Sequence, residues 1–194
     1  MKIPPLSWTP VDGTSTWPTP DTLVLTSAAG VDWTNDALGG EQQHAAGCLG
    51  FDAPEQFTLS ARVAVDLPRT TFDAGALAIW VDPDHWAKLC FEFSPAGEAM
   101  VVSVVTNGFS DDCNSTLVTA GHVYLRVSRI GAGWAFHSSP DGERWAFVRL
   151  FRLDTSAPAT VGFLAQAPMG ESAVARFDEI VYSLDIASDL RDGS

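Results

Sequence analysis

The chain has 194 residues, enough for one well-buried core and rather short for two ordinary domains. Its 24 acidic and 11 basic residues give a formal net charge of −13, which repels phosphate backbones and anionic lipid headgroups. Nucleic acid and membrane surfaces are therefore not expected as partners. Hydrophobic residues make up 46% and charged residues 18%, proportions typical of a globular chain rather than a disordered one.

The lack of a recognisable targeting signal and the pattern of cysteines predict a cytoplasmic protein. The first residues, Met1 to Pro5, lack the apolar stretch of a signal peptide, and no apolar run approaches the roughly 20 residues needed to span a bilayer. The three cysteines, Cys48, Cys90 and Cys113, are odd in number and include no CxxC pair. A disulfide framework and a structural zinc site are therefore not expected. No glycine-rich phosphate-binding motif occurs, and no cofactor is predicted.

The N-terminal part of the chain shows little regular periodicity. Residues 1–22 are rich in proline, which excludes a central strand or a helix interior, and we expect them to pack on the main domain as an extension. Residues 23–25 read as a short strand, and the glycine-rich stretch 30–50 reads as a loop. The main domain is expected over 23–186, followed by a polar tail over 187–194.

From residue 57 onward the apolar residues alternate with a period of two, which indicates β-strands. Gly, Pro and Asp separate these short runs, and scarcely any helical periodicity occurs. The pattern predicts an all-β sandwich or barrel. The expected strands cover residues 57–65, 76–81, 86–93, 100–106, 123–130, 134–138, 145–153, 160–165 and 173–184.

The strand over 86–93 carries the clearest functional signal. Ala87, Leu89, Phe91 and Phe93 are assigned to the core, so the residues between them must face away from it. Lys88 and Glu92 then lie on the outer face with Cα atoms roughly 13 Å apart. A tight turn over 82–85 would place Ala78 and Trp80 on that same face, beside Trp86. A sheet face with tryptophan, lysine and glutamate is typical of a binding floor.

Several segments in this order resemble the DUF1349 family, which includes YesU-like bacterial proteins and a fungal regulator-of-enolase branch. The resemblance covers about residues 20–184. The segments that carry it are Asp32–Trp33, Phe51–Pro54, Phe72–Leu77 followed by Trp80, Trp86–Glu92, Ser103–Asn107 followed by Ser110–Asp111, Leu125–Val127 with Arg129, and Ser138–Trp145. It implies a concanavalin A-like jelly-roll β-sandwich of two antiparallel sheets with a concave face, and it brings no established activity.

The leading hypothesis is a protein that binds a carbohydrate or small polyol on that concave face, with no established catalysis. Aromatic rings would stack on the sugar, while carboxylate, amide and ammonium groups would bind its hydroxyls. The alternative is a solvated cross-strand charge network without a ligand. The candidate ligand-binding residues are Trp80, Trp86, Lys88, Glu92, Ser103, Asn107, Ser110 and Asp111.

Two other functions stay open. A hydrolase or lyase would use Glu92 as acid or base, with Lys88 or one of Asp73, Asp111 and Asp112 as the second group. The E-x-D-x-x-E signature of the laminarinase-type glucanases of this fold is absent, which argues against that chemistry. A protein-interaction or regulatory module would instead present the concave face to a partner protein, and a homodimer is left open.

No metal site is predicted. The four histidines, at 44, 85, 122 and 137, are scattered without ligand spacing. The oxygens of Asp82, Asp84, Asp111, Asp112 and Asn114 are of the kind that calcium uses, but they show no EF-hand-like pattern. Cys90 lies on the outer face beside Lys88, either as a reactive thiol or as a small residue that makes room for the tryptophans.

Overall fold

A computed structural model describes residues 2–186, 189–191 and 193, and these residues form β-strands and turns but no helix. The strands are β1 (Ser7–Thr9), β2 (Thr14–Thr19), β3 (Thr22–Thr26), β4 (Trp33–Asn35), β5 (Gln42–His44), β6 (Cys48–Asp52), β7 (Gln56–Val65), β8 (Ala74–Asp82), β9 (His85–Phe93), β10 (Ala99–Asn107), β11 (Phe109–Leu117), β12 (His122–Ile130), β13 (Gly133–Ser139), β14 (Ala146–Phe151), β15 (Thr160–Gln166) and β16 (Val174–Ser183).

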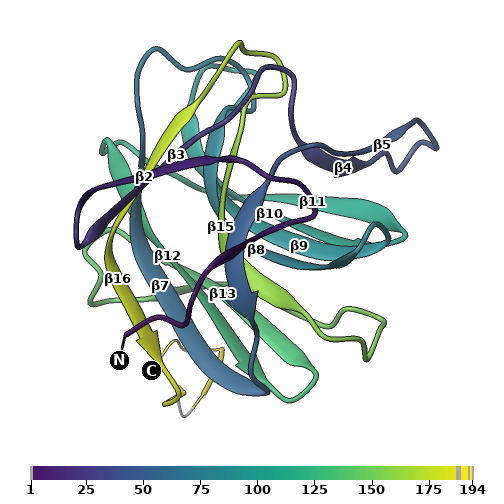
Figure 1. Ribbon diagram of the computed structural model, residues 1–194, viewed down its shortest axis with the longest axis vertical. Coiled ribbons are helices and arrows are strands. Elements are labelled where there is room, and N and C mark those ends of the chain that lie inside the picture. Colours follow the sequence, from purple (N-terminus) through teal and green to yellow (C-terminus); the bar gives the residue numbers. More distant parts are fainter. Residues whose placement is uncertain (1, 187–188, 192, 194) are drawn as a thin grey trace.

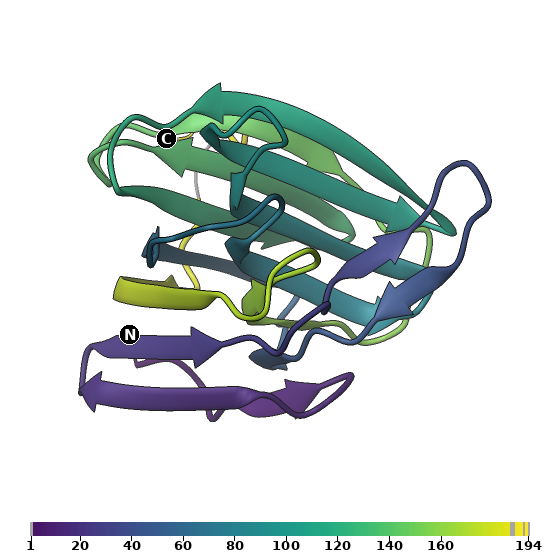
Figure 2. The same cartoon turned by 90° about the horizontal axis from the view of Figure 1, so that it is seen from above.

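Two antiparallel sheets of seven strands each pack face to face, which confirms the predicted β-sandwich (Figure 1). The first, called sheet A here, has the order β1-β6-β15-β8-β9-β10-β11. The second, sheet B, has the order β14-β13-β12-β7-β16-β3-β2. The short strands β4 and β5 form a separate hairpin, called the arm here (residues 33–44), which projects from the body of the sandwich (Figures 1 and 2).

The main core lies between the two sheets and follows the predicted alternation. Ala87, Leu89 and Phe91 of β9 belong to it, as do Leu59 and Val63 of β7 on the opposite sheet. Trp86 and Cys90 belong to a second apolar cluster, which lies on the other side of sheet A. The predicted assignment of alternate residues of β9 to two faces is therefore confirmed.

The N-terminal part of the chain contains strands that the sequence did not predict. The proline-rich residues 1–22 contribute β1 and β2, each at the edge of a sheet. Pro18 lies in β2 at a register shift between Thr16 and Thr19, where an edge strand tolerates the missing N–H. The stretch 30–50, interpreted as loop, contains the whole arm and most of β6.

Both sheets are completed by strands from late in the chain. In sheet A, β15 lies between β6 and β8, and in sheet B, β16 lies between β7 and β3. Of the expected polar tail, residues 187–188, 192 and 194 lie outside the described residues. The carbonyl oxygens of Leu190 and Gly193 bond to His137 and Arg126, at 2.7 Å each. Across the described ranges, no helix long and apolar enough to cross a membrane is found.

Candidate functional site

The candidate site lies on the outer face of sheet A, the face turned away from sheet B. The register between β8 and β9 sets its rows: Trp80 pairs with Trp86, Ala78 with Lys88, and Ala74 with Glu92. The alternation predicted from the sequence therefore brings Trp80, Trp86, Lys88 and Glu92 to one face. The alanines of β8 give this face a low floor, over which larger groups from the N-terminal part of the chain can pack.

The two tryptophans of this face are covered. Trp33 lies across both, with ring centroids 4.9 Å from Trp80 and 5.8 Å from Trp86, and His44 packs on them at 5.3 and 6.2 Å. Trp86 is 0% exposed and Trp80 8%. The expectation that these rings form an open stacking floor is therefore wrong. The arm, which the sequence did not reveal as structured, fills the space that a sugar would need.

Asn35 at the end of β4 fastens the arm to sheet A. Its side-chain amide donates to the carbonyl oxygens of Pro83 and Gly108, both at 2.9 Å, and its Oδ1 lies 3.3 Å from the Trp86 indole nitrogen and 2.8 Å from the His44 Nε2. The Asn35 backbone N–H donates to the hydroxyl of Ser110 at 2.9 Å. Ser110, predicted to contact ligand, is occupied by this structural contact.

Lys88 is buried and fully engaged. Its ammonium donates to Asp32 Oδ1 at 2.5 Å, to the Trp33 carbonyl oxygen at 2.8 Å and to Gln166 Oε1 at 2.8 Å, which uses all three hydrogens. Burial acts to lower the pKa of Lys88, but the negative charge of Asp32 outweighs it and the pKa is raised. The geometry thus favours an anchor for the Asp32–Trp33 segment over the catalytic role suggested by the sequence.

Glu92 differs from Lys88 in having no such partners. The residue is only 9% exposed, yet no hydrogen bond or ion pair joins its carboxyl group to any residue in the described part of the chain. Burial raises its pKa to about 7; the charges of Lys88 and Arg69 oppose this shift, and those of Asp32 and Asp112 add to it. Glu92 is therefore a nearly buried carboxyl group that exchanges its proton near neutral pH.

Two exposed residues share the surroundings of Glu92, one held to the end of β9 and one farther along the sheet. Phe72, in the loop before β8, is 37% exposed and has a left-handed backbone (φ 67°), which is rare for an aromatic residue. Its N–H donates to the carbonyl of Phe93 at 2.7 Å and its carbonyl accepts from Gln166 at 3.0 Å. Such strained positions concentrate at functional sites. On the other side, Asp112 of β11 lies in the same cross-strand row as Lys88.

Three predicted site residues lie elsewhere. Ser103 pairs with Leu89, so it faces the core, and Val102 and Val104 occupy the outer face of β10; the expected register was wrong by one residue. Asn107, at the end of β10, bonds to the backbone of Arg152 and Asp154.

Asp111 also alternates to the other face, where its carboxylate binds Arg149 at 2.5 Å. Of the carboxylates proposed as catalytic partners of Glu92, Asp73 is likewise on the core side, buried and bonded to the Thr70 N–H. Only Asp112 shares the face of Glu92. Two strand spacings and four residue rises separate their Cα atoms by about 16 Å, while the charge of Asp112 still contributes to the raised pKa of Glu92.

Cysteine and metal chemistry receive no support at this face. Cys90 is fully buried, and burial raises the pKa of its thiol well above the usual value, although Lys88 opposes the shift. Cys90 is therefore the small, unreactive residue of the two alternatives. His85 pairs with Asp82 at 2.9 Å in the β8–β9 turn. Among the described residues, no group of three His, Cys, Asp or Glu side chains is arranged to hold a metal ion.

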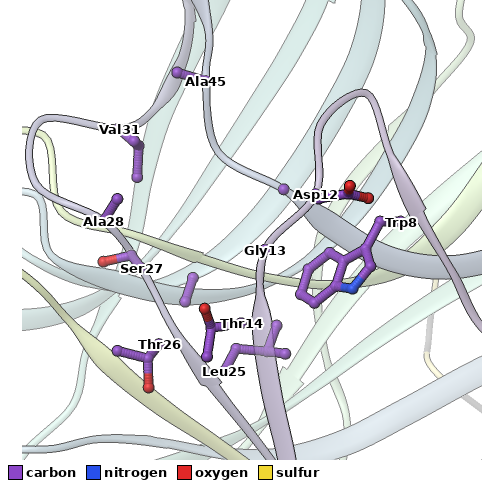
Figure 3. Close-up of a pocket in the computed structure, with 12 residues that line it drawn as sticks. Trp8, Asp12, Gly13, Thr14, Leu25, Thr26, Ser27, Ala28, Val31 and Ala45 are labelled. Atoms are coloured by element: carbon purple, nitrogen blue, oxygen red, sulfur yellow. The ribbon is translucent and has the colours of Figure 1, made fainter.

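A small cavity opens beside the candidate site, between the first turn of the chain and the end of β3 (Figure 3). Trp8 and Asp12 line one side of it, and Ser27 and Val31 line the other. Its volume is about 220 Å³, below the roughly 300–1,000 Å³ of typical small-molecule sites. The Ser27 hydroxyl already accepts the Ala173 N–H at 2.8 Å. The cavity is too small for an oligosaccharide.

Sequence reasoning missed the residues that close the site. Asp32, Asn35 and Gln166 come from segments far from β9 in the chain; the segment that contains Asp32 and Asn35 packs on sheet A, and β15 carries Gln166. The sequence shows Asp32 and Trp33 as a family motif. The only sequence feature that indicates their position near β9 is Lys88, a lysine predicted on the outer face without a partner. A lysine there needs an acidic partner, and Asp32 supplies it.

The fold is a jelly-roll β-sandwich, and the outer face of sheet A carries a covered apolar cluster with Lys88 and Glu92 beside it. The jelly-roll fold is similar to that of carbohydrate-active enzymes. A xylan beta-1,4-xylosidase from Bacillus halodurans C-125 has a TM-score of 0.65 at 16% identity, over 94% of this chain and 40% of that one. An alginate lyase from Klebsiella pneumoniae has a TM-score of 0.54 at 13% identity, over 88% and 84%. At these identities the likeness concerns the fold alone.

The chain belongs to the family described as "Protein of unknown function (DUF1349)", which matches residues 8–184, and the predicted resemblance is thereby confirmed. A curated relative, "Regulation of enolase protein 1" of Saccharomyces cerevisiae, is 31% identical over 147 residues, covering 74% of this chain and 72% of the relative. A crystal structure of a functionally unknown protein from Saccharomyces cerevisiae has a TM-score of 0.84 at 24% identity, covering 94% of this chain and 98% of that one.

Proposed function

We propose that the protein binds a carbohydrate or other small polyol on the outer face of sheet A, at the carboxyl group of Glu92. The observation that carries this proposal is the carboxyl group of Glu92, nine-tenths buried and without a hydrogen-bond partner among the described residues. The carboxyl oxygens of Glu92 are not among the fully buried polar atoms without a partner, so they keep some contact with water, which ligand hydroxyls are suited to replace. The covered tryptophans serve as the scaffold of this site rather than as its stacking surface.

The residues around Glu92 provide complementary contacts. Its ionised carboxylate would accept hydrogen bonds from two adjacent hydroxyls. Phe72 is 37% exposed and its backbone N–H is bonded to β9, and the C–H face of a sugar ring packs well on an exposed aromatic ring. Because the pKa of Glu92 is about 7, polyol binding should weaken as the pH falls below neutrality. The likeness in fold to sugar-active enzymes agrees with this ligand class.

The residues of this site support ligand binding better than they support catalysis. Lys88 has no hydrogen or lone pair to spare for a reaction, because Asp32, Trp33 and Gln166 engage it fully. Glu92 can exchange a proton near pH 7, but Asp112, the only one of the proposed partner carboxylates on its face, lies two strands away and four residues along the sheet. A reaction would need a second group from the ligand itself.

A thermal-shift screen of monosaccharides, uronates and small polyols, without oligosaccharides, tests the proposal. A ligand at 100 times its dissociation constant stabilises the fold by about 2.7 kcal/mol, which is readily seen as a melting shift. The shift should be lost in Glu92→Gln and kept in Glu98→Gln, a matched change at an exposed glutamate on the turn before β10. Equal shifts in both variants, or none in the wild type, would contradict the proposal.

A protein-interaction role is the second candidate. It is supported by the edge strand β11, which ends in exposed Phe109 and Leu117, 61% and 54% exposed. An open edge can pair with a strand of another protein. The name of the yeast relative, which refers to regulation of an enzyme, agrees with such a role. Capture of a partner should then depend on Phe109 and be insensitive to sugars, whereas Trp86 is too deeply buried to take part.

We also propose a cytoplasmic location. The three cysteines are free, and Cys48 and Cys90 are buried without a disulfide partner. Unpaired thiols of this kind are typical of a reducing compartment. Fractionation of cells that make the native protein provides the test, and recovery with the secreted or membrane fraction would contradict it.

A further inference from the structure

We propose a second ligand site, for a neutral oligosaccharide, in the large cavity between the N-terminal segment, the β2–β3 turn and the middle of β16. This cavity lies away from Glu92 and was not suggested by the sequence. Its volume is about 1200 Å³, at the upper end of small-ligand pockets, which suits several sugar units rather than one. Its lining includes Pro4, Trp17, Asp21, Arg62, Asp178 and Glu179.

The apolar wall of the cavity presents an open tryptophan. Trp17 is 43% exposed, the most open of the seven tryptophans, all of which lie within the described residues. It contrasts with Trp33 and Trp86, which are closed off on sheet A. Ile3, Pro4 and other apolar residues of the N-terminal segment continue this wall. An indole ring beside rigid proline rings forms a surface for the C–H faces of sugars at little entropic cost.

The polar wall is rigidly held. Arg62 of β7 donates to both carboxylate oxygens of Asp178, at 2.6 and 2.8 Å, and its Nε lies 3.5 Å from Glu179 Oε1. Tyr124 donates to the other Glu179 oxygen at 3.0 Å. A guanidinium and carboxylates side by side offer donors and acceptors together, which is what adjacent sugar hydroxyls require.

Strand irregularities shape the cavity from two sides. The pairing of β2 with β3 shifts register between Thr16 and Thr19, the stretch that contains Trp17. The pairing of β16 with β7 shifts between Asp178 and Val181, where Glu179 adopts a left-handed backbone (φ 48°). Such bulges redirect side chains and concentrate at functional sites, and non-glycine residues in this conformation are strained. Both irregularities bring cavity-lining residues out of the regular sheet pattern.

Charge argues for a neutral ligand. Arg62 balances one of the two carboxylates, the neutral Tyr124 hydroxyl donates a hydrogen bond to Glu179, and Lys2 on the same lining offsets Asp21, so the cavity carries only a small excess of negative charge. Asp21 and the net charge of −13 disfavour phosphates and uronates. Hydroxyl groups can bond to these paired charges without separating them.

Isothermal titration with neutral xylo-, cello-, malto- and laminari-oligosaccharides tests the site. At least one series should bind the wild type, and Trp17→Ala should weaken that binding about tenfold, since a stacked ring and its buried area contribute about this much. Glu179→Gln, which keeps the shape of the wall, should weaken it several-fold. Leu38→Ala, at a 96% exposed position on the arm, is the matched control and should bind normally.

Glu92→Gln separates this site from the proposed one on sheet A. Binding that depends on Trp17 should persist unchanged in Glu92→Gln, even if sugar binding on sheet A fails altogether. The inference is overturned if no neutral oligosaccharide binds, if Trp17→Ala and Glu179→Gln bind like the wild type, or if Glu92→Gln abolishes all binding. Binding of cationic peptides in place of sugars would overturn it as well.

Discussion

The outer faces of the two sheets have opposite characters. On sheet A the outer face is closed: Trp33 covers Trp80 and Trp86, and Lys88 is sealed beneath Asp32. On sheet B the ion pairs and Trp17 remain open to water. Alternation in a strand places a side chain outside the core, but only the rest of the chain decides whether it meets solvent. An outward-facing tryptophan is thus a weak sign of a binding surface until its cover is known.

Replacing Trp33, which covers the two tryptophans of sheet A, should lower the free energy of unfolding more than the other proposed changes. Trp33→Ala removes the ring that packs on Trp80 and Trp86, and a buried tryptophan lost from a packed cluster costs about 3–5 kcal/mol. Trp17→Ala on the open face should cost less than about 1 kcal/mol. Urea unfolding of both variants measures the difference. Similar losses of unfolding free energy in Trp33→Ala and Trp17→Ala would show that the outer faces of the two sheets do not differ in this way.

Replacing the buried Lys88 should lower the free energy of unfolding nearly as much. Lys88→Met leaves the Asp32 carboxylate and the Gln166 amide without their donor, and loss of one partner of a buried ion pair costs about 3–5 kcal/mol. Asp32→Asn in the same chain should restore part of this stability, because the uncompensated charge disappears. A double-mutant cycle measures the recovery, and strictly additive costs would show that the two residues are uncoupled.

Glu92 should make stability depend on pH. The pKa of Glu92 rises from the ordinary 4.5 to about 7 on folding, so its contribution is fully present below about pH 4.5 and is lost as the pH rises through 7. Between pH 5 and 8 the wild type should lose about 3 kcal/mol relative to Glu92→Gln. Unfolding free energies of both proteins across this range provide the measurement. Parallel pH profiles would show that Glu92 titrates normally.

The smallest effect is expected on the open face of sheet B. Arg176 and Asp66 form an ion pair at 2.7 Å, but their side chains are 45% and 43% exposed. Exposed pairs of this kind contribute about 0–1 kcal/mol and are screened by salt. Asp66→Asn should therefore change the unfolding free energy by less than about 1 kcal/mol, with a smaller effect at high salt. A cost comparable to that of Lys88→Met would contradict the assignment of the two faces.

Much of the fold could be predicted, because alternation and turn residues are local signals. The expected strand over 86–93 matches β9 within one residue, and the turn at 82–85 correctly predicts that Ala78 and Trp80 share the outer face with Lys88. Strand β11 was missed, because Phe109–Leu117 is an almost wholly exposed edge strand with polar residues on both faces. Such a strand carries no apolar alternation for the sequence to reveal.

The site was harder to predict than the fold, because it depends on contacts between distant segments. The register of β10 was displaced by one residue at Ser103, since a strand that is apolar on both faces, such as Met100–Val105, gives no sign of its orientation. The arm was interpreted as loop because β4 and β5 have three residues each. The cavity beside Trp17 arises from bulges, which leave no signature in the sequence.

The order of strands has a consequence for how the molecule is made. The pairs β1–β6 and β2–β3 are joined to the rest of their sheets only through β15 and β16, the last two strands in the chain. During synthesis β3 and β6, which lie in the first 52 residues, therefore cannot pair with their sheet neighbours β16 and β15 until residues 160–183 have been made. Neither sheet can close earlier, and a chain that stops before residue 160 leaves two pairs of strands with open edges. The two sheets of the native sandwich are therefore completed only by the last two strands, β15 and β16.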